Sequence, residues 1–207
     1  MVHETMKPEE IEKRSMEIIT SELKGRTWPE PKFSIVKRCI HTSADFDYAD
    51  NLVFSENAEN IGIDLIRKGA TIVTDTKMAA AGVNKSAIGS YGGDVKCFIS
   101  DEDVVSEAKA RGCTRAMISM ERAAKIEGPL IIAVGNAPTA LIALYEMVKA
   151  GKIKPGLVIG VPVGFVNVIE SKEMLMELDV PYIVAKGRKG GSNIAATICN
   201  AMIYYKG

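Results

Sequence analysis

Histidine, tryptophan and net charge are all scarce in this chain of 207 residues. It has two histidines, one tryptophan, and 26 Lys and Arg against 26 Asp and Glu. Zero net charge disfavours a protein that coats nucleic acid or an anionic membrane, because both bind mainly through positive charge. No uncharged apolar run reaches the ~18 residues of a membrane span, and the acidic N-terminus is unlike a signal peptide. We therefore expect a cytoplasmic protein that binds neither nucleic acid nor membrane.

Cysteine is also sparse, and its placement disfavours a metal site. The four cysteines stand singly, at Cys39, Cys97, Cys113 and Cys199. None forms a CxxC or CxxH pair, and only His3 and His41 offer imidazole ligands, so neither structural zinc nor any other metal site is expected. Isolated cysteines are typical of small buried hydrophobic residues in a reducing compartment.

The charge is unevenly distributed although its total is zero. Residues 1–103 carry a net charge of −5 and residues 104–207 a net charge of +5. An anionic ligand is therefore expected to bind the second half. With 47% hydrophobic residues the chain can build a sizeable core, and no repeat, low-complexity tract or linker divides it. We expect one domain over residues 1–207.

Hydrophobic periodicity predicts an α/β fold. Helices are expected over 8–24, 30–42 and 56–68, with Ser55 as N-cap and Gly69 as C-cap of the third. Beyond these, short apolar strands alternate with helices. The expected strands are 70–74, 95–99, 130–134, 157–161 and 181–185, and the helices are 76–82, 101–111, 114–127, 138–150, 168–178 and 191–205. This alternation predicts a doubly wound, mostly parallel sheet flanked by helices, after an N-terminal helical segment.

The segments that follow the strands are the expected ligand-binding positions. Doubly wound sheets bind ligands outside the carboxyl ends of their strands, near helix N-termini. Residues 75–78, 135–139, 160–165 and 186–193 each follow a predicted strand. We expect these four segments to converge on one rim.

The segment 186–193, KGRKGGSN, carries the strongest local signal. Its three glycines allow close approach of backbone to a ligand, and the following helix adds free N–H groups to its three cations. This chemistry suits a carboxylate or a phosphate. Neither GxxxxGK[ST] nor GxGxxG after the first strand is present, which disfavours a nucleotide-binding protein. The alternative is a glycine-rich turn with solvated cations.

His41 is the only histidine beyond the terminal segment, so imidazole acid/base chemistry would use it. It is expected near a helix C-terminus, with Arg38 one turn earlier on the same face. A histidine there is also a common capping or core residue. Similarly, Asn136 and Thr139 suit either helix capping or ligand contact, and residues 160–165 (GVPVGF) suit either an apolar wall or a tight turn.

Several segments together resemble the precorrin-8X methylmutase family of corrin biosynthesis. They are RCIH (38–41), DTKM (75–78), GNAPTAL (135–141), GVPVGFV (160–166), ESK (170–172) and GRKGGS (187–192). The resemblance runs over nearly the whole chain in order. It implies an isomerase that moves a methyl group from C11 to C12 of precorrin-8, giving hydrogenobyrinate, or of cobalt-precorrin-8, giving cobyrinate. It also implies a homodimer with the active site at or near its interface. The cobalt-containing substrate is slightly favoured.

The resemblance also implies roles for individual residues. His41 matches the family's proton donor and acceptor, and Ser15 and Arg38 match substrate-contacting positions. A flat, mostly apolar macrocycle fringed with carboxylates calls for an apolar slot and a cationic rim rich in N–H groups. Residues 160–165 are expected to supply the slot. The remaining substrate-binding candidates are Lys77, Arg115, Asn136, Thr139, Gly164, Arg188, Lys189, Gly190, Gly191 and Ser192.

Three points stay open at this stage. Asp45 and Asp75 are candidates for fixing the tautomer of His41, but their positions do not follow from the sequence. No cofactor or methyl donor is expected, because the methyl group moves within the substrate. Cobalt, if present, is carried by the substrate. The alternative function is that of a non-catalytic carrier holding a corrinoid.

Overall fold

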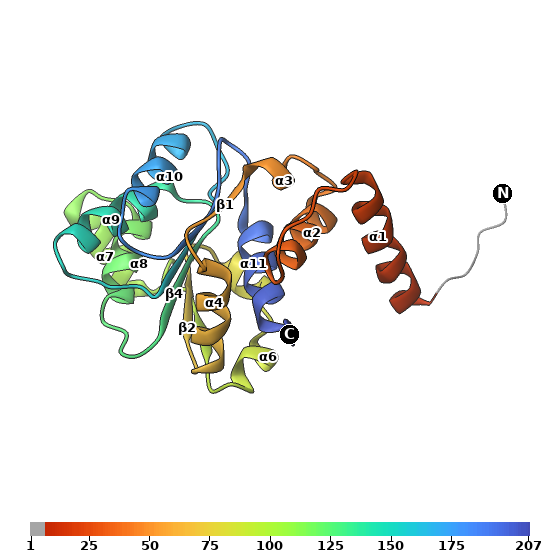
Figure 1. The fold of residues 1–207 in the computed structure, drawn as a ribbon. Helices are drawn as coiled ribbons and strands as arrows, with labels where there is room; N and C mark the ends of the chain where they lie inside the picture. Colours follow the sequence, from red (N-terminus) through yellow and green to blue (C-terminus); the bar gives the residue numbers. More distant parts are fainter. Residues whose placement is uncertain (1–6) are drawn as a thin grey trace.

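The computed structural model describes residues 7–207, so His3 lies outside the described part. Its centre is a six-stranded sheet with the order β1-β6-β5-β4-β2-β3 (Figure 1). The strands are β1 (Leu52–Phe54), β2 (Thr71–Thr74), β3 (Asp94–Lys96), β4 (Leu130–Val134), β5 (Leu157–Gly160) and β6 (Tyr182–Ala185). All neighbours are parallel except β1, which runs antiparallel to β6. The predicted doubly wound, mostly parallel sheet is confirmed.

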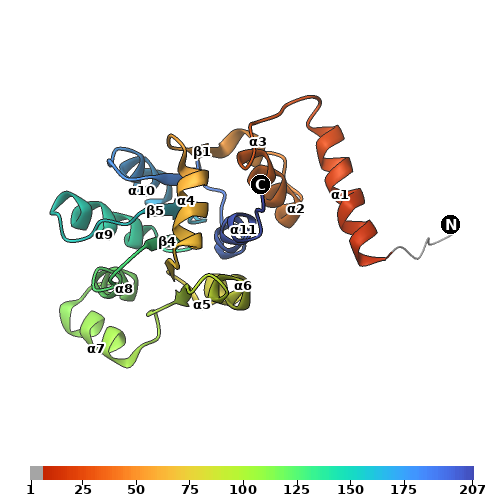
Figure 2. The same ribbon diagram turned by 60° about the horizontal axis from the view of Figure 1, so that its bottom comes forward.

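Helices cover both faces of this sheet (Figure 2). One face carries α4 (Ala58–Arg67), α5 (Lys77–Gly82), α6 (Lys85–Gly89) and α11 (Ser192–Ile203), and the other α8 (Arg115–Ala123), α9 (Pro138–Lys149) and α10 (Val168–Met176). Outside α8 lies α7 (Glu102–Arg111). Because both faces are covered, every residue of β4 is buried. This explains the apolar strands in the sequence.

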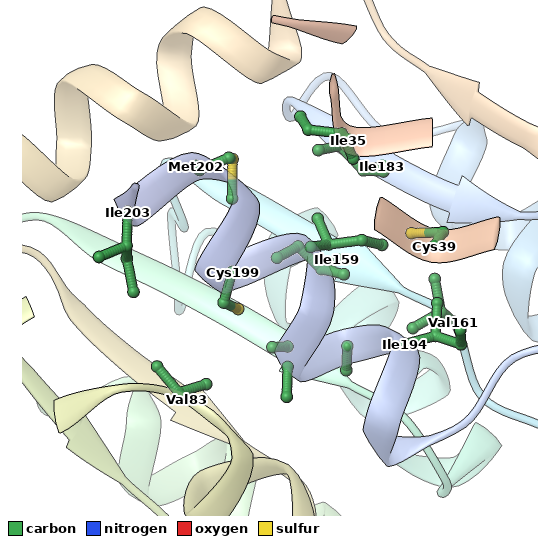
Figure 3. Packing of buried hydrophobic residues seen from close by; sticks show 14 of the residues in the cluster. Ile35, Cys39, Val83, Ile159, Val161, Ile183, Ile194, Cys199, Met202 and Ile203 are labelled. Carbon is green, nitrogen blue, oxygen red and sulfur yellow. The ribbon is translucent and has the colours of Figure 1, made fainter. Parts of the chain in front are cut away.

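Helix α11 holds the first face together. Its buried residues include Ile194, Cys199 and Met202, which pack between the sheet and α2 (Lys32–Ser43) (Figure 3). A Cβ at Gly62 of α4 would lie 2.8 Å from a side-chain carbon of Leu157, so α4 also sits close to the sheet. Since α2 lies on α11, the C-terminal end of α2 is fixed near the start of α11.

Helix α1 (Pro8–Glu22) projects from the rest of the chain and packs against α2 (Figures 1 and 2). Ile19 and the following Leu23 are buried there. On its other side Ile11 and Ile18 are 52% and 44% exposed. The helix therefore keeps an apolar stripe that no other part of residues 7–207 covers.

The structure corrects the sequence prediction at several boundaries. Ser55 is not the N-cap of α4: that position is Asn57, while the Ser55 hydroxyl accepts a 2.9 Å hydrogen bond from the Tyr182 N–H. The sequence prediction missed β1, α6 and α3 (Tyr48–Asn51), because segments of three to five residues show too little periodicity. Within residues 7–207 no helix is long and apolar enough to cross a membrane.

Candidate active site

The four segments that follow the strands do converge on one edge of the sheet. The Asp75 carboxylate, after β2, accepts hydrogen bonds from the N–H groups of Gly135, Asn136 and Ala137, after β4, at 2.8, 2.8 and 2.7 Å. The Asp75 side chain is buried, and this burial raises its pKa more than the three N–H groups lower it. Asp75 therefore shapes the neighbouring turn and is not free to orient His41.

The glycine-rich segment 187–191 sits against the loop after β5. The Gly164 N–H donates to the Arg188 carbonyl at 3.2 Å, and the Gly191 N–H donates to the Val161 carbonyl at 2.9 Å. At Gly190, with φ +156°, a Cβ would lie 2.1 Å from the Val161 oxygen. Glycine is required there because the two backbones touch.

The start of α11 joins this rim to the segment after β2. The hydroxyls of Thr76 and Ser192 are 2.7 Å apart, which places the neighbouring Lys77 beside the N-terminus of α11. At the other end of the rim, the Thr114 hydroxyl donates to the Thr139 hydroxyl at 3.1 Å. Arg115, next to Thr114, therefore lies near the start of α9. All of the rim residues predicted from the sequence thus belong to one edge of the sheet.

The cations of the rim differ in their availability. Lys189 Nζ lies 2.5 Å from an Asp45 oxygen and 2.6 Å from an Asp47 oxygen, and these contacts lower the pKa of the Asp45 carboxyl. Lys189 is therefore already paired, and Asp45 is engaged with it and not with His41. Arg188 has no acidic partner in the described chain and lies over the Phe165 ring, 5.6 Å from its centroid. Within residues 7–207 Arg188 therefore remains available for a ligand, as do Lys77 and Arg115, which form no ion pair there.

The loop after β5 exposes a strongly apolar surface. Phe165 and Val166 are 83% and 78% exposed, and Val163 is also exposed. Exposed apolar side chains on this scale mark a binding surface for a ligand or a partner. This position agrees with the expected apolar slot, although nothing in the described part of the chain closes it into a pocket.

His41 is exposed near the C-terminal end of α2 and lines two cavities. The first, of about 190 Å³, is shared with Arg38 and with side chains of α11. The second, of about 230 Å³, lies between α1 and α2 and is also lined by Ser15. Both are smaller than the ~300–1,000 Å³ typical of small-molecule sites. The three residues from the resemblance are thus brought together, but in an open groove.

Local contacts hold Arg38, Ser15 and the neighbouring Thr42 in place. Arg38 pairs with Glu12 of α1 at 2.6 Å, and the Ser15 hydroxyl donates to the Ile11 carbonyl within the same helix at 2.9 Å. The Thr42 hydroxyl, next to His41, lies 2.9 Å from that of Thr197 in α11. The groove therefore has polar walls from three helices.

Sequence reasoning missed the polar side chains that α11 contributes. Thr197, Asn200 and Tyr204 line the cavity of His41 and Arg38. Together with Asn193 they form a stripe spaced by three or four residues on an otherwise apolar helix. That stripe was a readable signal. Lys172, a buried residue of α10 whose ammonium contacts segment 187–191, was also missed.

Comparisons with known proteins point to one family. The profile of the precorrin-8X methylmutase family matches residues 10–205. The chain is 47% identical over 198 residues to cobalt-precorrin-8 methylmutase of Priestia megaterium, covering 96% of this chain and 88% of the relative. It is 43% identical to the enzyme of that name from Salmonella typhimurium, covering 99% of this chain and 98% of the relative.

A solved structure is also similar to this chain over nearly its whole length. It is the precorrin-8X methylmutase of Thermus thermophilus, with a TM-score of 0.87, 39% identity and coverage of 94% of each chain. The match spans nearly the whole fold. The chain belongs to the precorrin-8X methylmutase family, whose members are intramolecular methyl-shifting isomerases of cobalamin biosynthesis.

Proposed function

We propose that this protein moves a methyl group from C11 to C12 of cobalt-precorrin-8 and that His41 provides acid/base assistance. The observation that carries this proposal is the placement of His41 and Arg38 in one cavity with the polar stripe of α11. Just beyond α2, Asp45 contacts the rim through its ion pair with Lys189, and the rim offers N–H groups and cations for the carboxylates of a corrinoid. The family relationship supplies the reaction class.

The reaction is an isomerisation, so atoms and electrons balance within the substrate. The bond between C11 and the methyl group breaks as the bond between C12 and the methyl group forms. In our proposal the His41 imidazolium first gives a proton to the conjugated ring system and takes it back after the shift. His41 is suited to this exchange because its side chain is exposed in the groove. No cofactor or methyl donor is then needed.

Binding is proposed to divide the macrocycle between two kinds of surface. Phe165 and Val166 offer apolar contact to the flat ring, while Arg38 and Arg188 offer planar guanidinium groups to its carboxylates. The Glu12 carboxylate now beside Arg38 occupies the position that a substrate carboxylate would take. Ser15 would donate a hydrogen bond from the second cavity.

We further infer that a homodimer completes the site. The two cavities lined by His41 are small and open for a corrinoid, and two apolar surfaces of the chain are exposed: Ile11 and Ile18 on α1, and Phe165 and Val166 after β5. A second copy packed on these surfaces would close the groove. Sedimentation should show a dimer, and Ile18→Glu should shift it toward monomer. A monomeric parent protein contradicts this inference.

The cobalt-containing substrate is supported by the names of the similar enzymes from Priestia megaterium and Salmonella typhimurium. The experiment is a comparison of turnover with cobalt-precorrin-8 and metal-free precorrin-8X under the same conditions. Faster turnover of the cobalt form is expected. Faster turnover of the metal-free form would reverse this assignment and leave the methyl shift intact.

The role of His41 is tested with His41→Ala and His41→Gln, assayed by the spectral change from cobalt-precorrin-8 to cobyrinate. Both variants should lose about 10²–10⁴-fold in kcat, the usual contribution of a general acid/base. Binding of cobyrinate should change little, because His41→Gln keeps a polar side chain in the groove. Near-parental turnover in both variants would exclude the proton transfer. Tight binding with no turnover by the parent protein would instead indicate a corrinoid carrier.

A further inference from the structure

Lys172 is a cation buried where the fold would favour an apolar residue. It lies on the inward face of α10 with Val168, Ser171 and Leu175, and is 1% exposed. Its ammonium forms no ion pair in the described chain, and burial lowers its pKa to about 8. A buried cation without a counter-ion costs stability, which a methionine of similar length would not. Stability alone therefore does not account for this residue.

The ammonium of Lys172 is held by two backbone carbonyls of the glycine-rich segment. Nζ donates to the Gly187 oxygen at 2.8 Å and to the Lys189 oxygen at 2.9 Å. From the other side, Gly164 and Val161 bond to the backbone of Arg188 and Gly191. Segment 187–191 is thus clamped between the loop after β5 and one buried side chain.

This clamp determines where two N–H groups of the segment point. The peptide bonds after Gly187 and Lys189 are trans, so each N–H points opposite to the preceding carbonyl. Since both carbonyls point inward to Lys172, the N–H groups of Arg188 and Gly190 point away from α10. Neither N–H has an acceptor within residues 7–207. Two outward N–H groups, two positions apart in the chain and beside the Arg188 guanidinium, fit a carboxylate.

We propose that Lys172 is a positioning residue: by holding the carbonyls of Gly187 and Lys189 inward, it presents the N–H groups of Arg188 and Gly190 to a carboxylate of the substrate. This inference rests on the proposed function, since it names the group that the rim binds. Lys172 itself touches no substrate. Lys172 affects the affinity for the substrate. It does not affect the proton exchange, because we propose that exchange for His41 on α2.

The test compares Lys172→Met with the parent protein, using cobyrinate as the binding probe and cobalt-precorrin-8 as the substrate. We expect affinity for cobyrinate to fall by about tenfold or more, since losing the clamp misaligns two hydrogen bonds. KM should rise in parallel while kcat stays within about threefold. The melting temperature should change little, because removal of the buried charge offsets the loss of the donor to the Gly187 and Lys189 carbonyls. The control is Lys154→Met, which removes an exposed lysine at the other end of the strands.

Each outcome decides the proposal. Unchanged affinity in Lys172→Met, or a fall in kcat with unchanged KM, overturns it. If Lys172→Met does not fold, the test is made on the parent protein by ¹⁵N NMR. Cobyrinate must then shift the amide signals of Arg188 and Gly190. Unshifted signals overturn the proposal. A parent protein that binds cobyrinate without turnover refutes the methylmutase proposal, while the affinity comparison still tests Lys172. A parent protein that binds no cobyrinate refutes both.

Discussion

Replacing Asp75 by asparagine tests how the binding edge is built. One Asp75 oxygen accepts from the N–H groups of Asn136 and Ala137, and the other accepts from that of Gly135. In Asp75→Asn the amide oxygen can keep the first two bonds. Its NH₂ group then faces the buried Gly135 N–H, so a donor meets a donor. The substitution leaves this one N–H without an acceptor.

The expected cost follows from that single unsatisfied group. Leaving a buried donor unpaired costs about 1–3 kcal/mol. Losing the charge adds little, because burial already disfavours the carboxylate enough to raise its pKa. At about 2–4 °C per kcal/mol for a protein of this size, a cost of about 2 kcal/mol should make Asp75→Asn melt about 4–8 °C below the parent. Asp75→Ala, which removes all three acceptors, should melt lower still.

The assay is thermal unfolding followed by circular dichroism, with Asp64→Asn as the matched control. Asp64 lies on the exposed side of α4, so the same chemical change there should alter the melting temperature by less than about 2 °C. If Asp75→Asn melts within about 1 °C of the parent, the three hydrogen bonds do not stabilise the fold and our reasoning about this edge is wrong.

Three further predictions follow from burial and contact. Gly190→Ala should weaken cobyrinate binding and lower the melting temperature, because its Cβ would overlap the carbonyl of the facing loop; parental values for both would contradict the close approach. Cys39 and Cys199 should resist alkylation at pH 8 until the protein unfolds, since burial raises both thiol pKa values, that of Cys199 to about 12; mass spectrometry of the native protein checks this. The ion pair of Lys189 with Asp45 lowers the carboxyl pKa, so its stabilisation is present at neutral pH and lost as pH falls through that lowered pKa. Asp45→Asn should accordingly be less stable than the parent at pH 7, by at most about 1 kcal/mol, and equally stable near pH 2.

The sequence predicted the sheet and its edge well because the signals are local. An apolar run such as 130–134 is continuous, and the turns after the strands carry glycine, proline and asparagine at readable positions. The convergence of those turns follows from parallel pairing alone. His41 was singled out by its rarity, and its position beside Arg38 follows from helical spacing.

The partners of the charged groups were not predictable in the same way. Nothing local indicates that Lys189 pairs with Asp45, 144 positions earlier, or that Asp75 accepts from a turn 60 positions later. These pairings depend on how loops fold over the sheet edge. The role of Lys172 was not predictable for another reason. The helical pattern predicts the face of α10 on which Lys172 lies, but not how deeply its ammonium group is buried.

The Asp75 carboxylate has a consequence for what this fold can bind. The chain passes from β2 to β3 on one side and then returns to place β4 on the other side of β2. The crevice between β2 and β4 is therefore the switch point where doubly wound proteins commonly hold a nucleotide phosphate. Here the Asp75 side chain already occupies that crevice and accepts from its N–H groups. The N–H groups that the topology would otherwise offer to a nucleotide phosphate are thus already bonded within the chain.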